Sequence, residues 1–171
     1  MAEAKAQLNI AASDDSHDVE LASKIAAARQ EWERDTSKAL ITRTVEHRLP
    51  MWLDVIRLSV QPVIAISSII YVDNNGDEQT LDAANYYLDI DELRFKTSFN
   101  KPALEDRSEA VRITYTAGYG AASTDVPEID KLAIKLSVAN RFEDLDMING
   151  GAGERKAYEN LVRKHMRSSY P

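Results

Sequence analysis

The feature that most constrains the fold is a strand pattern that ends in two glycines shortly before a helix. Residues 109–116 end in a strict alternation of apolar and polar side chains, and Gly118, Gly120 and Pro127 follow. Alternation predicts a half-buried strand, glycines mark a tight turn, and proline is favoured in the first turn of a helix. The segment therefore predicts a structural strand–turn–helix joint, and none of its residues indicates catalysis.

Two long segments have helical periodicity. Residues 15–38 place apolar side chains at helical spacing from Val19 to Trp32, and the oxygen-bearing side chains at 13–16 are suited to cap the helix start. Residues 127–145 repeat this spacing, and a short helix is expected at 3–9. We expect the long N-terminal helix to pack on the helix after Pro127, since its alanine-rich stretch allows a close approach.

Short β-branched segments fill the region between these helices. They predict strands at 41–49, 55–58, 66–72, 79–81, 86–90, 93–95 and 109–116. The turn from Asp73 to Asp77 contains Asn75-Gly76, a pair that tolerates positive φ and favours a hairpin. The spacing predicts a small antiparallel β-sandwich or barrel-like sheet.

The chain is expected to be an α+β protein with a β-rich insertion. The helical core takes residues 1–40 and 124–149, and the inserted β subdomain takes 41–123. Residues 150–171 form a C-terminal tail, which follows a glycine-rich, flexible break at 149–153 and contains a basic helix at 154–167.

Charge is unevenly distributed along the chain. The whole sequence carries −7, yet residues 154–171 hold five basic and two acidic side chains, which leaves −10 for the remainder. An acidic chain is unsuited to be a dedicated binder of DNA or anionic membranes. The basic tail indicates either an acidic protein partner or simply a solvated helix face.

No recognisable catalytic or cofactor motif is present. Cysteine is absent, the three histidines fall on separate predicted elements, and neither a nucleophile elbow nor a glycine-rich phosphate loop occurs. The turn at Asp73, Asn75 and Asp77 resembles the start of a calcium loop, but its glycine is two places early and Ala84 stands at the twelfth position. We therefore expect no enzyme activity, no metal site and no cofactor.

Aromatic side chains allow two interpretations. Trp32 and Trp52, with Tyr86, Tyr87, Tyr115 and Tyr119, are suited either to an interface or to packing within the fold. We interpret Trp32 and Tyr115 as core residues. The chain also has an intact start without an apolar signal segment, so we expect it to stay inside the cell that makes it.

An ordered set of short segments provides more specific information than any one motif. It comprises residues 3–10, 14–15, 25–29, 38–42, 56–58, 62–63, 68–73, 76, 78–81, 87–88, 113–120 and 126–128. Together these resemble the head-tail connector (adaptor) proteins of tailed bacteriophages, in the form with a β-rich insertion between helices. The resemblance covers residues 3 to about 146.

The resemblance implies a viral structural protein of the virion neck, made in the bacterial host cytoplasm. Such adaptors form a ring of about twelve copies under the portal protein and join the capsid to the tail, or to the next neck protein, a stopper or tail terminator. DNA passes through the channel without specific binding, and no membrane is involved. The resemblance offers no catalytic residues to transfer.

The tail after residue 149 departs from the resemblance. In related adaptors the C-terminal segment often reaches toward the portal, so we assign the tail to portal binding. The basic contacts would be Arg155, Lys156, Arg163, Lys164 and Arg167. The apolar anchor would be Tyr158, Leu161, Val162 and Met166.

Two other functions remain open from the residues. The first is a small non-viral adaptor that binds one partner through its tail and forms no ring. The second is a carboxylate-based hydrolase, which needs two facing carboxylates in a pocket of the β insertion.

Overall fold

The computed structural model describes residues 1–143 and 152–168, which form two compact units. One unit is helical and comprises Met1–Ser37 and Val126–Pro171. The other is the β unit, Lys38–Asp125, which lies between these two stretches in the sequence. The fold is therefore α+β, as expected.

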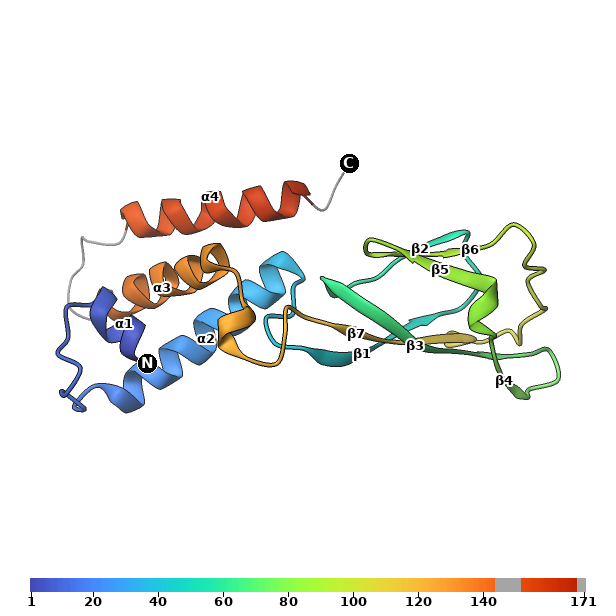
Figure 1. Cartoon of the computed structure of the whole chain (residues 1–171), viewed down its shortest axis with the longest axis horizontal. Helices are drawn as coiled ribbons and strands as arrows, with labels where there is room; N and C mark the ends of the chain where they lie inside the picture. Colours follow the sequence, from blue (N-terminus) through green and yellow to red (C-terminus); the bar gives the residue numbers. More distant parts are fainter. Residues whose placement is uncertain (144–151, 169–171) are drawn as a thin grey trace. The chain divides into compact units, whose positions relative to one another are not determined.

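The helical unit contains α1 (Ala2–Gln7), α2 (Asp18–Thr36), α3 (Glu128–Glu143) and α4 (Ala152–Ser168). The pairing of α2 with α3 that the sequence predicts is confirmed, and α4 lies along both (Figure 1). Leu21, Ala28 and Val138 form the buried contact, joined by Ala4 from α1. Ala28 is fully buried, because its small side chain lets the two helices approach closely.

The capping expected for α2 is wrong in detail. The residue before the helix is His17, which makes no side-chain cap hydrogen bond. Asp14 instead accepts hydrogen bonds from the backbone N–H of Ser16 at 3.0 Å and from its hydroxyl at 2.6 Å. A short polar side chain bonds readily to the backbone two residues on, and this local turn competes with capping.

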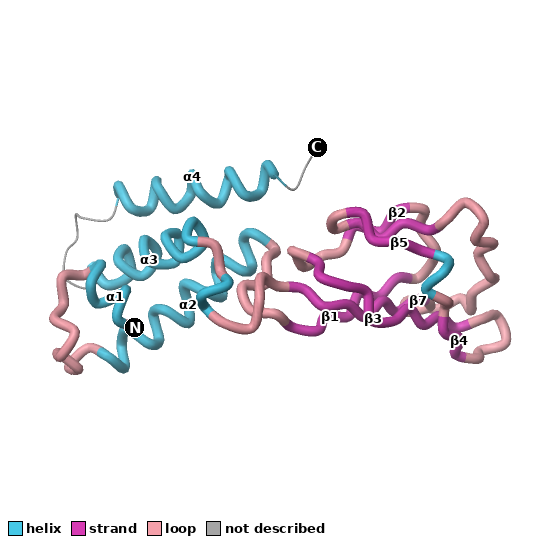
Figure 2. The backbone as a smooth tube through the Cα atoms, viewed as in Figure 1, coloured by secondary structure: helices cyan, strands magenta, loops and turns pink. Residues whose placement is uncertain are grey.

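The β unit contains seven strands and two short 3-10 helices. The strands are β1 (Arg43–Leu49), β2 (Val55–Arg57), β3 (Val63–Val72), β4 (Glu78–Thr80), β5 (Tyr86–Asp89), β6 (Glu92–Phe95) and β7 (Val111–Ala117), and the 3-10 helices are η1 (Ala83–Asn85) and η2 (Ser123–Asp125). They form two antiparallel sheets in the orders β1-β7-β3-β4 and β2-β6-β5, layered face to face (Figure 2). The sandwich prediction is confirmed, and no closed barrel forms.

The core lies between the two sheets. Ile56 and Leu93 face inward from the three-stranded sheet, and Ile69, Ile113 and Tyr115 face inward from the four-stranded sheet. The buried Tyr115 hydroxyl accepts a hydrogen bond from the Val60 N–H at 3.0 Å, which satisfies its polar end. Trp32, in the helical unit, is also fully buried, so both residues interpreted as core are core.

The strand–turn–helix joint is also confirmed. Along β7, fully buried residues alternate with half-buried ones, and α3 begins directly after Pro127. Gly118 has φ +135°, and a Cβ atom placed there would lie 2.6 Å from the backbone of Thr42. Only glycine fits this position, because both the backbone conformation and the close approach exclude a side chain.

Candidate functional site

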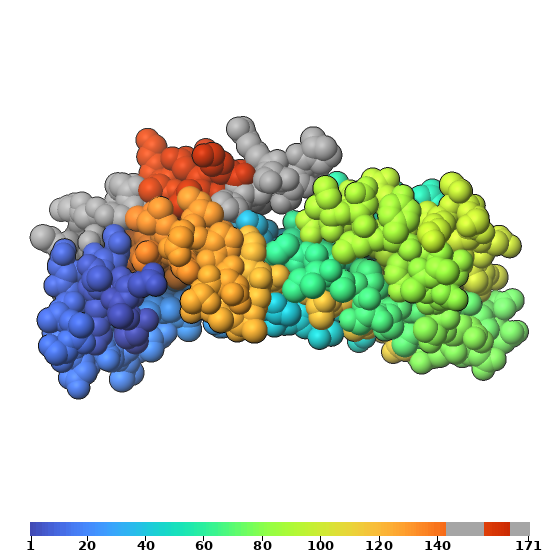
Figure 3. Space-filling model, viewed as in Figure 1, coloured from blue at the N-terminus to red at the C-terminus, as the bar shows by residue number. Residues whose placement is uncertain are grey.

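Helix α4 carries the residues that the sequence assigns to portal binding. Lys156, Arg163 and Lys164 are exposed, whereas Tyr158, Leu161 and Val162 are half-buried. The space-filling view shows α4 lying against α3 (Figure 3). The structure therefore separates the two groups: the described basic side chains are exposed, and the described apolar ones are partly covered. The side chains of Arg155, Met166 and Arg167 lie outside the described residues.

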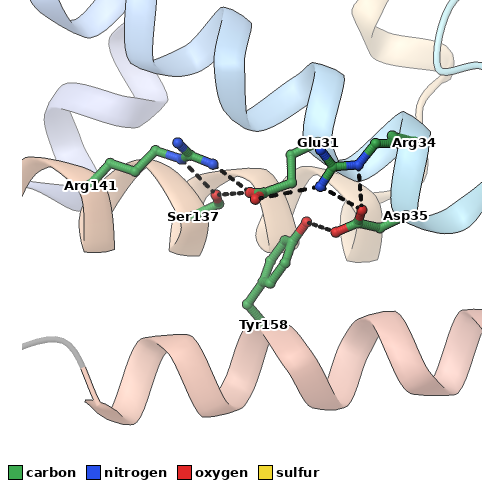
Figure 4. A network of polar contacts seen from close by, with 6 residues as sticks. All are labelled: Glu31, Arg34, Asp35, Ser137, Arg141 and Tyr158. Atoms are coloured by element: carbon green, nitrogen blue, oxygen red, sulfur yellow. Dashed lines mark hydrogen bonds and ion pairs between the residues drawn. The ribbon is translucent and has the colours of Figure 1, made fainter.

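Tyr158 connects α4 to α2. Its hydroxyl donates to Asp35 Oδ2 at 3.3 Å (Figure 4). Its ring meets the Trp32 ring edge-on, with centroids 5.8 Å apart. Burial, together with the neighbouring carboxylates of Glu31 and Asp35, raises the pKa of Tyr158 well above its ordinary value. The hydroxyl therefore stays protonated and serves as a donor.

A polar network lies beneath this contact. Glu31 Oε2 accepts from Arg141 Nη2 at 2.5 Å and from the Ser137 hydroxyl at 3.3 Å, so it links α2 to α3 (Figure 4). Arg34 pairs with Asp35 at 2.9 Å. Beside the network lies a cavity of about 410 Å³, lined by Glu31, Asp35, Ser137, Asn140, Arg141, Tyr158 and Glu159.

The sequence interpretation did not identify this network. Its signal was available in the spacing, because Glu31 and Asp35 stand four residues apart on one face of α2 beside Trp32. Ser137 and Arg141 have the same spacing on α3. The network can position α4 through one tyrosine, and it offers no paired acid and base aimed at a substrate.

Three neighbouring carboxylates of the β unit, Asp89, Asp91 and Glu92, make contacts within the unit. Asp91 Oδ1 accepts the Val63 N–H at 2.8 Å, and Glu92 binds both Arg57 at 3.1 Å and Arg94 at 2.7 Å. Asp89 pairs with Arg94 at 3.3 Å. These contacts fix strands and a hairpin, so the three carboxylates have structural roles.

The turn with the calcium-like sequence is closed by its own side chain. Asp73 accepts hydrogen bonds from the N–H groups of Asn75 at 2.9 Å and Asp77 at 3.2 Å, and from the Gln79 amide at 3.1 Å. These hydrogen bonds, that of Asn75 above all, hold the pKa of Asp73 below its ordinary value. Among residues 1–143 and 152–168, no group of three or more His, Asp or Glu side chains is placed to hold a metal ion.

Within that same part of the chain, no helix has the length and apolar character needed to cross a membrane.

Comparison with known proteins gives no match to a family model and none to a curated protein. Solved structures do match. A chain from the virion of a native gene transfer agent (GTA) particle has 26% identity and a TM-score of 0.73, covering 95% of this chain and 86% of its own length. A chain from the neck of an empty GTA particle, computed with C6 symmetry, has 28% identity and a TM-score of 0.68, covering 88% and 79%.

A third match comes from the neck of a native GTA particle, computed with C12 symmetry. It has 25% identity and a TM-score of 0.66, covering 85% of this chain and 80% of its own length. The fold therefore defines a structural neck protein of phage-like particles, with a non-enzymatic role at the virion neck. The resemblance to tailed-phage head-tail connector proteins is confirmed.

Proposed function

We propose that this protein is a head-tail connector that forms a ring of about twelve copies under a portal protein. The ring would join the capsid to the tail, or to the next neck protein, around the DNA channel. The observation that carries the proposal is the likeness to GTA chains over 85–95% of the sequence, which includes both units. The C12 symmetry of one of those necks supports the copy number.

Identical subunits form a ring when one face of each copy binds a different face of the next copy. A contact between two different faces of identical subunits repeats around an axis and closes when the rotation permits. The division of the chain into a helical core (1–40 and 124–149), an inserted β subdomain (41–123) and a tail (150–171) belongs to the same proposal. We assign the inward surface to a channel that repels DNA, consistent with the net charge of −7.

The tail is proposed to make the portal contact. The exposed Lys156, Arg163 and Lys164 would meet an acidic portal surface, together with Arg155 and Arg167. Tyr158, Leu161 and Val162 are partly covered by the protein's own helices, so the basic face makes the first contact. Met166 completes the apolar anchor that the sequence predicts.

The decisive experiment is the native mass of this protein co-expressed with the portal protein of the same genome. A complex that carries about twelve copies supports the connector. A persistent monomer or dimer with no portal association contradicts it and favours the small adaptor that binds one partner without a ring.

A further inference from the structure

The tip of the β3–β4 hairpin carries Asn75 followed by Gly76, and both residues are exposed. Gly76 has no Cβ atom to obstruct an approaching group. A Cβ atom placed there would have Glu105 Oε1, at 4.0 Å, as its nearest neighbour, so the surroundings are open as well. The Gly76 nitrogen and the Asn75 side chain can therefore meet when the backbone between them is free to turn.

The reaction that this pair permits is spontaneous deamidation, for which water is the only co-reactant. The Gly76 backbone nitrogen bonds to the side-chain carbonyl carbon of Asn75. The Asn75 side-chain nitrogen leaves as ammonia, together with the proton that Gly76 gives up. Water then opens the resulting ring at one of its two carbonyl carbons. One opening gives aspartate, and the other gives isoaspartate, whose main chain is longer by one carbon.

In the folded hairpin the attacking nitrogen is occupied. The Gly76 N–H donates to the Asp73 carbonyl at 3.0 Å, and Gly76 has φ +87°. Asp73 to Gly76 thus form a turn that ends in a left-handed glycine, a common connection between antiparallel strands. Attack on Asn75 requires the nitrogen to leave this hydrogen bond, so the closed turn disfavours the reaction.

The Asp73 carboxylate fastens the same turn. Its Oδ1 accepts the N–H of Asn75 at 2.9 Å and that of Asp77 at 3.2 Å. Its Oδ2 accepts the Gln79 amide at 3.1 Å. One side chain therefore holds the residue before Gly76 and the residue after it.

The base of the hairpin is held independently of its tip. At the end of β3, the Val72 N–H donates to the Ala110 carbonyl at 2.9 Å, and the Val72 carbonyl accepts the Glu105 N–H at 3.1 Å. Residues 74–77, by contrast, are all exposed. The tip can therefore open locally while the two sheets remain folded.

We propose that Asn75 is a deamidation site that Asp73 keeps unreactive while the hairpin is closed. Opening of the tip releases the Gly76 nitrogen, and the conversion then proceeds. The change is irreversible, because ammonia leaves. An isoaspartate also lengthens the main chain between the two N–H groups that share Asp73 Oδ1, so the original turn does not form again. This inference is independent of the proposed ring and of its portal contact.

The first test compares the folded and the unfolded chain. Peptide mass spectrometry of the full-length protein, kept in mildly alkaline buffer, measures the conversion of amide to acid at Asn75. The folded wild type should convert at least about tenfold more slowly than the same chain in urea, because the reaction requires opening. Asn74 is the internal control, since a residue with a side chain follows it, and in urea it should convert more slowly than Asn75. Equal rates at Asn75 in the folded and unfolded chain overturn the proposal.

The second test removes the carboxylate. Asp73→Ala should raise the conversion rate of folded Asn75 on the order of tenfold, because the open tip becomes more populated. Asp73→Asn retains an acceptor oxygen and should restore most of the protection. The matched control is Asp82→Ala, since Asp82 accepts the Ala84 N–H at 2.8 Å outside this hairpin. A rate in Asp73→Ala equal to that of the wild type, or to that of Asp82→Ala, overturns the proposal.

A third measurement decides the matter if Asp73→Ala does not fold. Wild-type protein is incubated at urea concentrations below its unfolding transition. Conversion of Asn75 that accelerates while the β unit is still folded supports local opening of the tip. Conversion that accelerates only together with global unfolding overturns the proposal.

Discussion

Single residues in this protein hold positions that local sequence preference alone would not assign. Lys5 is 5% exposed, and its ammonium group reaches Asp18 at 2.6 Å and the Asp14 carbonyl at 2.8 Å. It thereby ties α1 to the loop before α2. A buried cation is stable only when its donors are satisfied, and Lys5 meets that condition through the loop before α2 and the first residue of α2.

Gly118→Ala should strongly destabilise the β unit. The new Cβ meets the Thr42 backbone, and φ +135° is strained for any side chain, so we expect a loss of about 2–4 kcal/mol in the free energy of unfolding. Urea unfolding measures the change. The control is Gly76→Ala, where φ is +87° but the nearest atom is 4.0 Å away. It should cost only about 1–2 kcal/mol, and equal costs would contradict the clash.

Two substitutions of Tyr158 should separate the contributions of its hydrogen bond and of its ring to the packing of α4 on α2. Tyr158→Phe removes the hydrogen bond to Asp35 and keeps the ring against Trp32, so we expect a loss of about 0.5–1 kcal/mol. Tyr158→Ala should cost about 2 kcal/mol more. Hydrogen exchange of α4 amides measures docking. If both variants protect α4 as the wild type does, Tyr158 does not hold the helix.

At the scale of elements, α4 and the β3–β4 hairpin each place different kinds of side chain in different surroundings. On α4 the described basic side chains are exposed and the apolar ones contact α2 and α3. In the β3–β4 hairpin, the Asp73 carboxylate accepts hydrogen bonds from the backbone N–H groups of Asn75 and Asp77. Both arrangements begin with the local order of side chains. On α4, the packing of α2 and α3 then decides which side chains are covered.

Charge reversal on α4 tests the portal contact. The triple variant Lys156→Glu, Arg163→Glu and Lys164→Glu should retain its fold, because the three side chains are exposed. Portal affinity should fall on the order of tenfold or more at low salt. The control reverses two exposed basic residues elsewhere, Arg29 and Lys96. Equal portal affinity of the triple variant and the control would contradict a portal contact through the basic residues of α4.

The β3–β4 hairpin should lose stability in acid. Hydrogen bonds lower the pKa of Asp73 from its ordinary value of 3.8, so its contribution is complete above that value. It is lost as the pH falls through the lower folded value. The stability advantage of the wild type over Asp73→Asn should therefore shrink when urea unfolding is repeated from roughly pH 6 downward. A pH-independent difference would contradict this role.

At the scale of the whole molecule, the net charge and the fold are those expected of a subunit in a larger particle. The chain carries −7, and its fold matches chains of GTA necks and virions. Exposed apolar side chains remain on both units, which suits a protein that completes its burial by association.

The complete protein should not retain duplex DNA. An acidic surface repels phosphates, so we expect no binding tighter than about 10⁻⁴ M at physiological salt. Fluorescence anisotropy of a labelled duplex provides the measurement. Tighter binding that weakens steeply with salt would contradict a channel that DNA passes freely, and would assign the basic tail to nucleic acid instead.

The sequence by itself determined the elements whose signals are local. The β7–Gly118–Pro127 joint, the Asn75-Gly76 hairpin and the α2 and α3 helices were predictable because side-chain periodicity and turn chemistry operate over a few residues. The pairing of α2 with α3 followed from two apolar faces that each need a partner. The resemblance to connector proteins was carried by the order of such segments.

Only the tertiary structure decided how the strands divide between sheets and which side chains are buried or exposed. It split the strands into two sheets, buried Lys5, and turned Tyr158 toward Asp35, an assignment that α4 alone could not show. It also exposed Ile64 and Ile90 through a register shift and a left-handed turn. The sheet order, the Tyr158 contact and the register shift depend on contacts between residues far apart in sequence, whose geometry no local pattern contains.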